Sequence, residues 1–458
     1  STTLRGVSAS EGKIQTIKHG SLLEAVVRYV KSGNDFYAEV VRKNSGSLNV
    51  IQPMSSAAVA SDNYDAIPIK SPIYAATEVI DEFGNRIIVC GIVPGSEVES
   101  EFEVTLIDGE TGEVIPRSTT LTTLASSIDL ADSADSVETT DLTLPSNDED
   151  AESLVSGSES ITRSNIVGIA LANQGADLAA GKGMESAVNA AKKDAWGAFG
   201  AVSAGSTRYN NIDVDASSVN VIAGISRGVD TEIGQLTTGV FFEYGSNAYD
   251  THGSGNASYM GGGILGRADF KNLGNGHFYA EASARLGGLS NDFDSNVLFD
   301  GWGRKASYDS QTTYYGGHLG AGYELILKED LKIDFYGKYF WLHQDEDDLR
   351  ISTGEKVKFD AVSSSRLRGG MRATYAINEQ ITPYIGVAIE HEFDGKARAS
   401  VYDYSLKTAN IQGDTGIGEI GLIMKPSDKY PWIIDLGVQG YTGQREGIGG
   451  SLRIGFEF

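Results

Sequence analysis

The sequence predicts an all-β membrane barrel: a twelve-stranded antiparallel transmembrane β-barrel with an N-terminal helix in its lumen, preceded by a β-rich segment. Three observations predict this fold. Apolar and polar residues alternate with a period of two from about residue 194 to the end. The alternating segments are about 10 to 12 residues long, whereas strands of soluble proteins average about five or six. Aromatic residues gather at strand ends, as in interfacial girdles.

Strand by strand, one face is apolar and the other carries polar and charged residues. Between 331 and 341, for example, Leu331, Ile333 and Phe335 alternate with Lys332 and Asp334. A face that meets lipid and a face that meets a polar lumen produce this pattern. The twelve predicted strands are 195–204, 216–227, 235–246, 257–269, 276–288, 311–326, 331–343, 362–377, 381–393, 413–425, 431–442 and 447–458.

The predicted connections alternate in length. Turns such as 328–330, 378–380 and 426–430 are short, and we expect long loops around 289–310, 344–361 and 394–412. Barrels of the outer membrane have short periplasmic turns and longer external loops. An even strand count then places both ends of the barrel on the periplasmic side, so a segment before strand one can run up the lumen.

Residues 161–193 predict that segment as a helix. Alanine dominates, β-branched residues become rarer and proline is absent. Glycines at 175, 181 and 183 predict a division into two pieces. About 30 helical residues span roughly 45 Å, enough to cross a bilayer, but no face is apolar enough for lipid. Small side chains suit a narrow, protein-lined channel.

Residues 1–125 predict short strands broken by turns, among them 48–51 and 86–93. Residues 102–107 and 112–115 predict a hairpin, while 22–30 fits either a strand or a short helix. We expect Cys90 to be a small buried core residue.

Residues 126–160 predict an acidic, disordered linker. The stretch 118–162 contains no Lys or Arg and ten acidic residues. Such a segment has too little apolar surface to offset the entropy of ordering it.

Composition excludes several functions. With 62 acidic against 37 basic residues and a net charge of −25, the chain lacks the basic character of a nucleic-acid-binding protein. One cysteine permits neither an intrachain disulfide nor a cysteine metal cage. The sequence contains no run of about 18 apolar residues, so it predicts no membrane-spanning helix. We expect no cofactor, no metal site and no enzymatic activity.

A basic strip is predicted inside the barrel. Arg366, Arg368 and Arg372 alternate on one strand, and Lys338 lies on the strand before it. In one interpretation these cations are pore lining solvated by water. In the other, they contact backbone carbonyls of the helix or the acidic linker during transit. Candidate counter-charges are Glu281, Glu390 and Glu457.

Two histidines merit a check for chemistry. His343, near Asp345, Asp347 and Asp348, is the best candidate for an acid–histidine pair at the external rim. His391 lies between Glu390 and Glu392, but the period of two turns the carboxylates inward and the histidine outward. We therefore predict a histidine at the rim or at the membrane interface, and not a metal ligand.

Residues 161–458 resemble the autotransporter β-domain family, the translocators of type V secretion. The resemblance lies in the alanine-rich helix that runs directly into 194–209, in the segment 383–396 and in the aromatic terminus 452–458. It implies transport of an N-terminal passenger across the outer membrane to the cell surface, with the helix plugging the pore afterwards. Residues 1–125 would then be the C-terminal remnant of the passenger, and we expect the chain to be part of a longer precursor.

The resemblance also implies partners. The barrel assembly machinery would read the terminal strand with Phe456 and Phe458, and the other partners would be the chain's own passenger and outer-membrane lipid. We expect a monomer that binds no nucleic acid. Our alternative is a self-contained barrel that acts as a porin or surface hydrolase.

Some members of the family cut themselves between two Asn residues inside the barrel helix. The helix here contains Asn165, Asn173 and Asn189, but no Asn-Asn pair; the pair in this sequence, Asn210-Asn211, follows strand one. We therefore predict no self-cleavage, and expect the helix asparagines to cap or hydrogen-bond to lumen groups.

Overall fold

The computed structural model of the chain describes residues 157–458 apart from 193, 300–304, 402–403, 426–428 and 430–431, together with strands before residue 124 and residues 21–22. The predicted linker therefore lies outside the described residues as far as 156. The strands of the N-terminal part are β1 (Ile14–His19), β2 (Leu23–Ser32), β3 (Asp35–Val41), β4 (Leu48–Val50), β5 (Tyr74–Ile80), β6 (Arg86–Ile92), β7 (Ser100–Val104) and β8 (Thr119–Thr123).

These N-terminal strands form antiparallel pairs. β1 to β4 make one sheet in sequence order, β5 pairs with β6, and β7 pairs with β8. The segment that fitted either a strand or a helix is the strand β2. The predicted hairpin partner 112–115 lies outside the described residues, and so does the side chain of Cys90, whose backbone belongs to β6.

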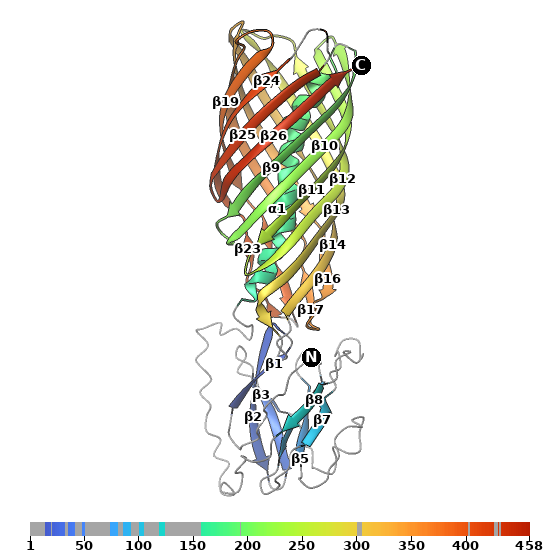
Figure 1. Cartoon of the computed structure of the whole chain (residues 1–458), viewed down its shortest axis with the longest axis vertical. Helices are drawn as coiled ribbons and strands as arrows, with labels where there is room; N and C mark the ends of the chain where they lie inside the picture. The colour runs from blue at the N-terminus through green and yellow to red at the C-terminus, as the bar shows by residue number, and fades with distance from the viewer. Residues whose placement is uncertain are drawn as a thin grey trace.

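Residues 196–457 form a closed antiparallel barrel of twelve strands (Figure 1), which confirms the predicted fold class. The last strand pairs with the first, from Glu457 opposite Gly197 to Arg445 opposite Tyr209, so the barrel has no free edge. Its strands are β9 (Trp196–Tyr209), β10 (Val214–Thr231), β11 (Gly234–Asp250), β12 (Gly253–Phe270), β13 (Gly276–Phe299), β14 (Lys305–Lys328), β15 (Leu331–Gln344), β18 (Val362–Tyr375), β19 (Ile381–Glu392), β24 (Gly413–Met424), β25 (Trp432–Gly443) and β26 (Arg445–Glu457).

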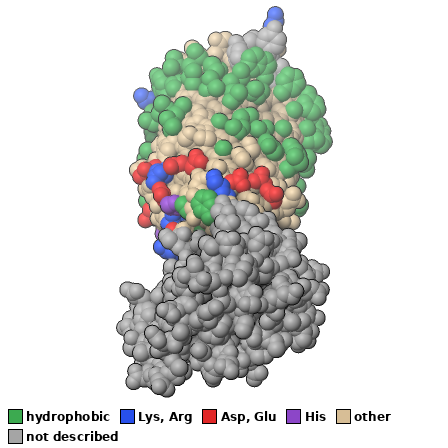
Figure 2. Space-filling model, turned by 60° about the horizontal axis from the view of Figure 1, so that its bottom comes forward, with side chains coloured by type: hydrophobic (Ala, Val, Ile, Leu, Met, Phe, Trp, Pro, Cys, Tyr) green, Lys and Arg blue, Asp and Glu red, His purple; other side chains and the backbone are tan. Residues whose placement is uncertain are grey.

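The outer surface of the barrel is apolar. Large side chains that alternate with lumen residues are exposed there, among them Ile264, Leu286, Leu319, Ile385 and Ile448. Figure 2 shows hydrophobic side chains spread over this surface and charged side chains gathered nearer the end with the long loops. An apolar band of this kind is the surface that a membrane barrel presents to lipid.

Two strands extend well beyond their predicted ends. β13 and β14 are each 24 residues long, so the predicted loop at 289–310 is wrong: most of it continues the ladder, with a register shift between Asp294 and Phe299. The segment has many Ser, Asn and Asp residues, which suggest a turn in the sequence. Its inward side chains, Phe293 and Tyr308, nevertheless pack in the core.

The other two predicted loops carry small sheets at the mouth of the barrel, by which we mean the end where these long connections lie (Figure 1). One sheet joins β16 (Asp347–Arg350), β17 (Lys356–Phe359), β21 (Ala399–Val401) and β22 (Tyr404–Ser405); the other pairs β20 (Lys396–Ala397) with β23 (Ala409–Asn410). In these sheets, backbone N–H and C=O groups of the long connections find hydrogen-bond partners.

One continuous helix occupies the lumen, and the predicted division into two pieces is wrong. It consists of α1 (Glu159–Leu178), a π-helical segment η2 (Ala179–Gly183) and α2 (Met184–Ala190). The glycine-rich part therefore contains a local widening and not a break, which is a usual way for a helix to absorb an extra residue. Among the described residues, no helix is long and apolar enough to cross a membrane.

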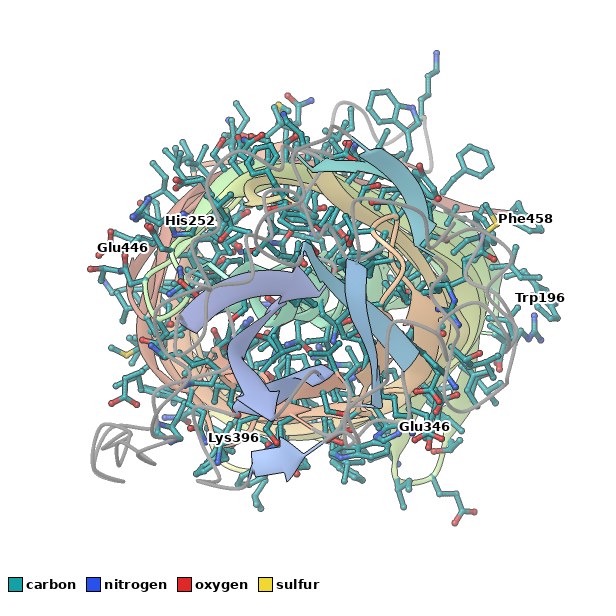
Figure 3. The ribbon with its side chains drawn as sticks, turned by 90° about the horizontal axis from the view of Figure 1, so that it is seen from below. Trp196, His252, Glu346, Lys396, Glu446 and Phe458 are labelled. Atoms are coloured by element: carbon teal, nitrogen blue, oxygen red, sulfur yellow. The ribbon has the colours of Figure 1, made fainter. Side chains whose placement is uncertain are left out.

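The axis view shows how the two ends of the chain's barrel meet (Figure 3). Trp196 and Phe458 lie side by side on the outer surface, and the backbone amide of Phe458 donates to the carbonyl of Trp196 at 3.0 Å. Both aromatic side chains are exposed. They lie at the end of the barrel opposite the mouth, where the strands are joined by short turns.

Candidate functional site

The helix passes through the barrel with its first residues at the mouth. There Thr162 Oγ1 donates to the carbonyl of Lys407, at 2.6 Å, and Ser164 Oγ lies 2.6 Å from Tyr308 Oη. At the other end, Ser186 Oγ donates to the carbonyl of Ile454 on the last strand, at 2.7 Å. The helix thus spans the lumen from the mouth to the opposite end.

Small residues allow the helix to fit against the wall. Ala170, Ala172, Ala179 and Ala180 are buried, so the helix backbone approaches the strands closely. At Gly175 a Cβ atom would lie only 2.2 Å from Tyr259 Oη. This glycine therefore serves close packing against the wall, and not the loosening of the helix that its conformational freedom suggested.

Three arginines surround Asp177 of the helix. Arg366 Nη1 lies 2.7 Å from Asp177 Oδ1, Arg368 Nη2 2.8 Å from the same oxygen, and Arg445 Nη1 3.3 Å from Oδ2. Behind them, Glu390 accepts from Arg368 Nε at 2.8 Å. We call these five residues the Asp177 cluster; it joins the helix to strands β18, β19 and β26.

A second helix carboxylate, Glu185, meets the same strand β18 further from the mouth. Arg372 Nη1 donates to Glu185 Oε1, and its Nε donates to Glu419 Oε1, both at 2.6 Å. Arg453 Nε lies 3.4 Å from the other oxygen of Glu185. The guanidinium of Arg372 thus bridges the helix and strand β24, a geometry that suits its several fixed donors.

The π-helical segment carries Lys182, which binds buried polar side chains of the barrel wall. Lys182 Nζ donates to Asp435 Oδ2 and to Tyr384 Oη, both at 2.7 Å. Asp435 also accepts from Arg453 Nε at 2.8 Å and from Tyr384 Oη at 2.8 Å. Lys182 and Asp435 are both buried, and a buried ion pair is tolerated when further hydrogen bonds satisfy its members.

Barrel cations also bind carbonyl oxygens of the helix. Lys338 Nζ donates to the carbonyl of Ala180 at 2.6 Å and lies 3.0 Å from Glu281 Oε1. Arg366 Nη2 donates to the carbonyl of Asn173 at 3.2 Å, and Arg285 Nη1 to that of Ala172 at 3.0 Å. The predicted basic strip therefore lies against the helix, where it contacts both carbonyls and carboxylates.

The helix carboxylates were missed by sequence reasoning, although a signal for them exists. Between 164 and 191, Asp177, Lys182 and Glu185 are the only charged residues. Three isolated charges on an otherwise neutral, alanine-rich helix inside a charged lumen indicate ion pairs. Their partners Arg445 and Asp435 are far away in sequence and cannot be assigned from spacing.

The three asparagines of the helix occupy different surroundings. Asn173 Nδ2 donates to Ser364 Oγ at 2.9 Å. Asn165 is buried, with an Nδ2 that has no hydrogen-bond partner in the described part of the chain, and Asn189 is half-buried. The pair Asn210-Asn211 lies at a turn at the mouth of the barrel, where Asn211 Nδ2 donates to Asn410 Oδ1 at 3.0 Å.

The two histidines lie on the outer side of the barrel near the mouth. His343 Nδ1 is 2.9 Å from Ser363 Oγ, but its Nε2 is 3.6 Å from Asp345 Oδ1, too far for a hydrogen bond. His343 and Asp345 therefore do not form a hydrogen-bonded acid–histidine pair. His391 is half-buried, and its Nδ1 lies 2.6 Å from Asp414 Oδ1.

Predicted counter-charges and terminal aromatics also have definite places. Glu281 and Glu390 face the basic strip, whereas Glu457 accepts from the backbone amide of Lys192, at 3.3 Å, near the end of the helix. Phe456 and Phe458 point outward, 43% and 66% exposed. They therefore lie on the lipid side, away from the helix.

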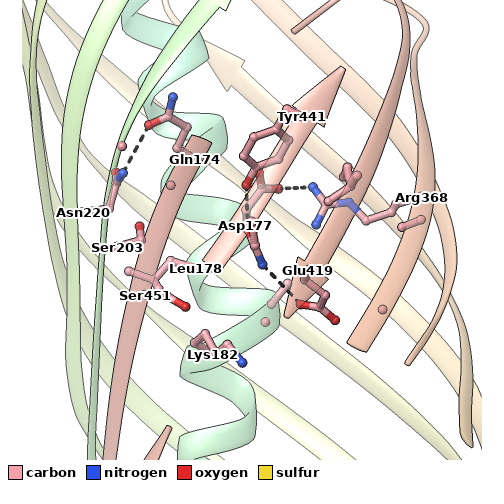
Figure 4. Close-up of a pocket in the computed structure, with 18 of the residues that line it drawn as sticks. Gln174, Asp177, Leu178, Lys182, Ser203, Asn220, Arg368, Glu419, Tyr441 and Ser451 are labelled. Carbon is pink, nitrogen blue, oxygen red and sulfur yellow. Dashed lines mark hydrogen bonds and ion pairs between the residues drawn. The ribbon is translucent and has the colours of Figure 1, made fainter. Parts of the chain in front are cut away.

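A polar cavity of about 130 Å³ remains beside the helix. A water molecule needs roughly 10–15 Å³ of such space, so several waters fit. Figure 4 shows Gln174, Asp177 and Lys182 of the helix facing this cavity, with Arg368 and Glu419 on the wall. The helix therefore blocks the lumen without filling it completely.

The sequence matches the autotransporter β-domain family over residues 195–434, more than half of the chain. The chain belongs to this family. Autotransporter β-domains are translocators, and their barrel lies in the outer membrane. No curated protein sequence matches this chain significantly.

Several solved structures are similar to this autotransporter β-domain at low identity. The β-domain of the Bordetella autotransporter Brka is 17% identical with a TM-score of 0.47, over 58% of this chain and all of that one. The transport unit of AIDA-I from Escherichia coli is 14% identical with a TM-score of 0.45, over 58% of this chain and 90% of that one. The translocator domain of NalP from Neisseria meningitidis is 11% identical with a TM-score of 0.47, over 65% and 97%.

Proposed function

We propose that this autotransporter β-domain moves the residues before the helix across the outer membrane and then holds them at the cell surface. The observation that carries the proposal is the course of the chain: from strand β9, the helix leads back through the lumen to the mouth. Every residue before 157 therefore precedes a segment that emerges at the end with the long loops. Residues 1–125 are then the C-terminal part of the passenger.

In this proposal the helix is the last segment to be transported and becomes the plug. Ion pairs with Asp177, Lys182 and Glu185 stop it at one position, because each charge meets an opposite charge of the wall. The wall presents its charges in matching order, which gives the helix a fixed height. Buried ion pairs add little net stability but discriminate strongly against wrong partners.

Export is tested on intact cells that produce the chain with a secretion signal and an N-terminal epitope tag. External protease should remove the tag and leave the barrel in the outer membrane. A second tag placed in the short turn at Glu329–Asp330 should remain protected, and serves as the control for membrane integrity. A protected N-terminal tag on a folded barrel would contradict export and favour a porin or surface hydrolase.

Plugging is tested separately by replacing Arg366, Arg368 and Arg372 with Ala in the purified, refolded chain. Loss of these contacts should raise the single-channel conductance in planar bilayers, because the helix is no longer fixed. A triple Lys variant preserves the charge and serves as the control. Unchanged conductance in the Ala variant would contradict the role of the strip in holding the plug, and leave export unaffected.

We further propose that the assembly machinery recognises strand β26 through Phe456 and Phe458 before the barrel closes. In the folded state β26 is paired with β9 along its length, so its edge is accessible only earlier. Deletion of Phe458 should reduce the amount of heat-modifiable barrel in the outer membrane. Equal amounts with and without Phe458 would contradict this recognition.

A further inference from the structure

The turn between strands β1 and β2 lies against the mouth of the barrel. Ser21 and Leu22, in this turn, are fully buried. Figure 1 shows β1 directed toward the part of the barrel where β16 and β17 lie. The partner of the turn is the connection between these two strands, which includes Thr353 and Glu355.

Glu355 binds the backbone of the turn. Its Oε1 accepts from the amide of Leu22 at 3.0 Å, from the amide of Ser21, and from Ser21 Oγ at 3.1 Å. Ser21 Oγ also lies 2.8 Å from Thr353 Oγ1. Glu355 is 1% exposed. A carboxylate removed from water to this degree requires hydrogen-bond donors, and the turn supplies several of them.

Leu22 supplies the apolar half of the contact. It belongs to the same buried cluster as Leu298, Ile351 and Val357 of the rim, and as Ile161 of the helix. Removal of the turn would expose apolar surface at the very place where the helix enters the barrel. The contact therefore combines apolar burial with specific hydrogen bonds.

The backbone of the rim is tightly folded at this contact. The amide of Ile351 donates to the carbonyl of Glu355, and that of Gly354 donates to the carbonyl of Ile351, both at 2.9 Å. Gly354 has a φ of +103°, which favours glycine. The tight turn between β16 and β17 thus places the side chains of Thr353 and Glu355 beside each other.

We propose that residues 351–355 are a docking site for the turn at residues 21–22 of the same chain. The docked turn attaches the N-terminal strands to the barrel without a covalent link and covers the mouth over the helix. This attachment is independent of export, because it concerns the folded chain alone. If the acidic segment 126–156 is cut, the N-terminal part should therefore remain bound.

Proximity is tested with cysteine pairs in the full chain, refolded in detergent and carrying Cys90→Ser. Ser21→Cys with Thr353→Cys should form an intramolecular disulfide on mild oxidation, because the two side-chain oxygens are 2.8 Å apart. The matched control is Ser21→Cys with Asp213→Cys, at an exposed external turn. Equal yields in the two pairs, or disulfides only between chains, would contradict the proposal.

Attachment is tested by inserting a protease site into 126–156 and cutting the purified, refolded chain. The N-terminal fragment should elute with the barrel, and Leu22→Asp or Glu355→Ala should release at least tenfold more of it. Glu346→Ala, an exposed residue of the same rim, is the control and should release no more than the parent. Heat-modifiability shows that each variant barrel is folded. Complete release from the parent chain would overturn the proposal.

Discussion

The two halves of the lumen helix are held in different ways. Near the mouth, residues 161–172 pack within one large apolar cluster together with rim residues such as Phe359 and Leu406. Beyond residue 173 the helix packs apolar side chains against β9 to β12, and its charged side chains form ion pairs with residues of β18, β25 and β26. The difference indicates two tasks. The half near the mouth seals the barrel, and the other half sets the position of the helix.

Replacing Asp177 with Ala is expected to have the largest effect on this division. It leaves the guanidinium groups of Arg366, Arg368 and Arg445 with one carboxylate fewer in a buried site. Breaking a buried ion pair by removing one partner costs about 3–5 kcal/mol. Urea unfolding of the refolded barrel measures the loss. Asp177→Asn keeps the shape and an acceptor oxygen, so its loss of unfolding free energy should be smaller. An Asp177→Ala variant as stable as the parent would show that the cluster does not hold the helix.

Ile169→Ala examines the half of the helix near the mouth. Ile169 is fully buried near the mouth, and truncating a buried isoleucine costs about 2–5 kcal/mol. This variant should also raise ion leakage through the barrel, because the apolar packing forms the seal. Conductance in planar bilayers distinguishes the halves. If Ile169→Ala destabilises the protein with no change in leakage, the seal lies elsewhere.

Gly175→Ala examines how closely the helix fits where the halves meet. The added Cβ atom would lie 2.2 Å from Tyr259 Oη and 2.6 Å from Arg285 Nη2. Overpacking of this kind costs about 1–3 kcal/mol. Chemical denaturation measures the change. A stabilised Gly175→Ala variant would mean that the wall yields easily at this height.

Gly181→Ala is the matched comparison and should have the smallest effect. No atom lies within 4 Å of a Cβ built at Gly181, which borders the polar cavity. Alanine is favoured over glycine in helices by roughly 1 kcal/mol, so the variant should be neutral or slightly more stable in the same denaturation experiment. A loss as large as that of Gly175→Ala would contradict the free space found there.

Alternation predicted which side chains face the lumen, because the direction of a strand side chain depends on its position alone. Arg366, Arg368, Arg372 and Glu390 are therefore found inside, as their spacing indicated. Alternation cannot predict that Arg445 meets the same carboxylate as Arg366. That meeting depends on the register of strands far apart in sequence.

Other features depend on tertiary packing in the same way. The polar residues around Asp294 suggested a loop, yet the strand continues because Phe293 and Leu298 are buried beneath it. The glycines of the helix suggested a break, yet the helix is continuous inside the barrel. Local composition described what these segments tolerate, and the barrel decided what they form.

The π-helical segment has a consequence for the rotational phase of the helix. Asp177 and Glu185 are eight residues apart, and eight residues of an ordinary helix would leave their directions roughly 80° apart. One extra residue within 179–183 absorbs this difference, so both carboxylates point to arginines of strand β18. Removing one residue from 179–183 would straighten the helix and keep the two in phase. The same deletion within 161–172 would rotate the half near the mouth by about 100° and turn its sealing apolar side chains away from the wall.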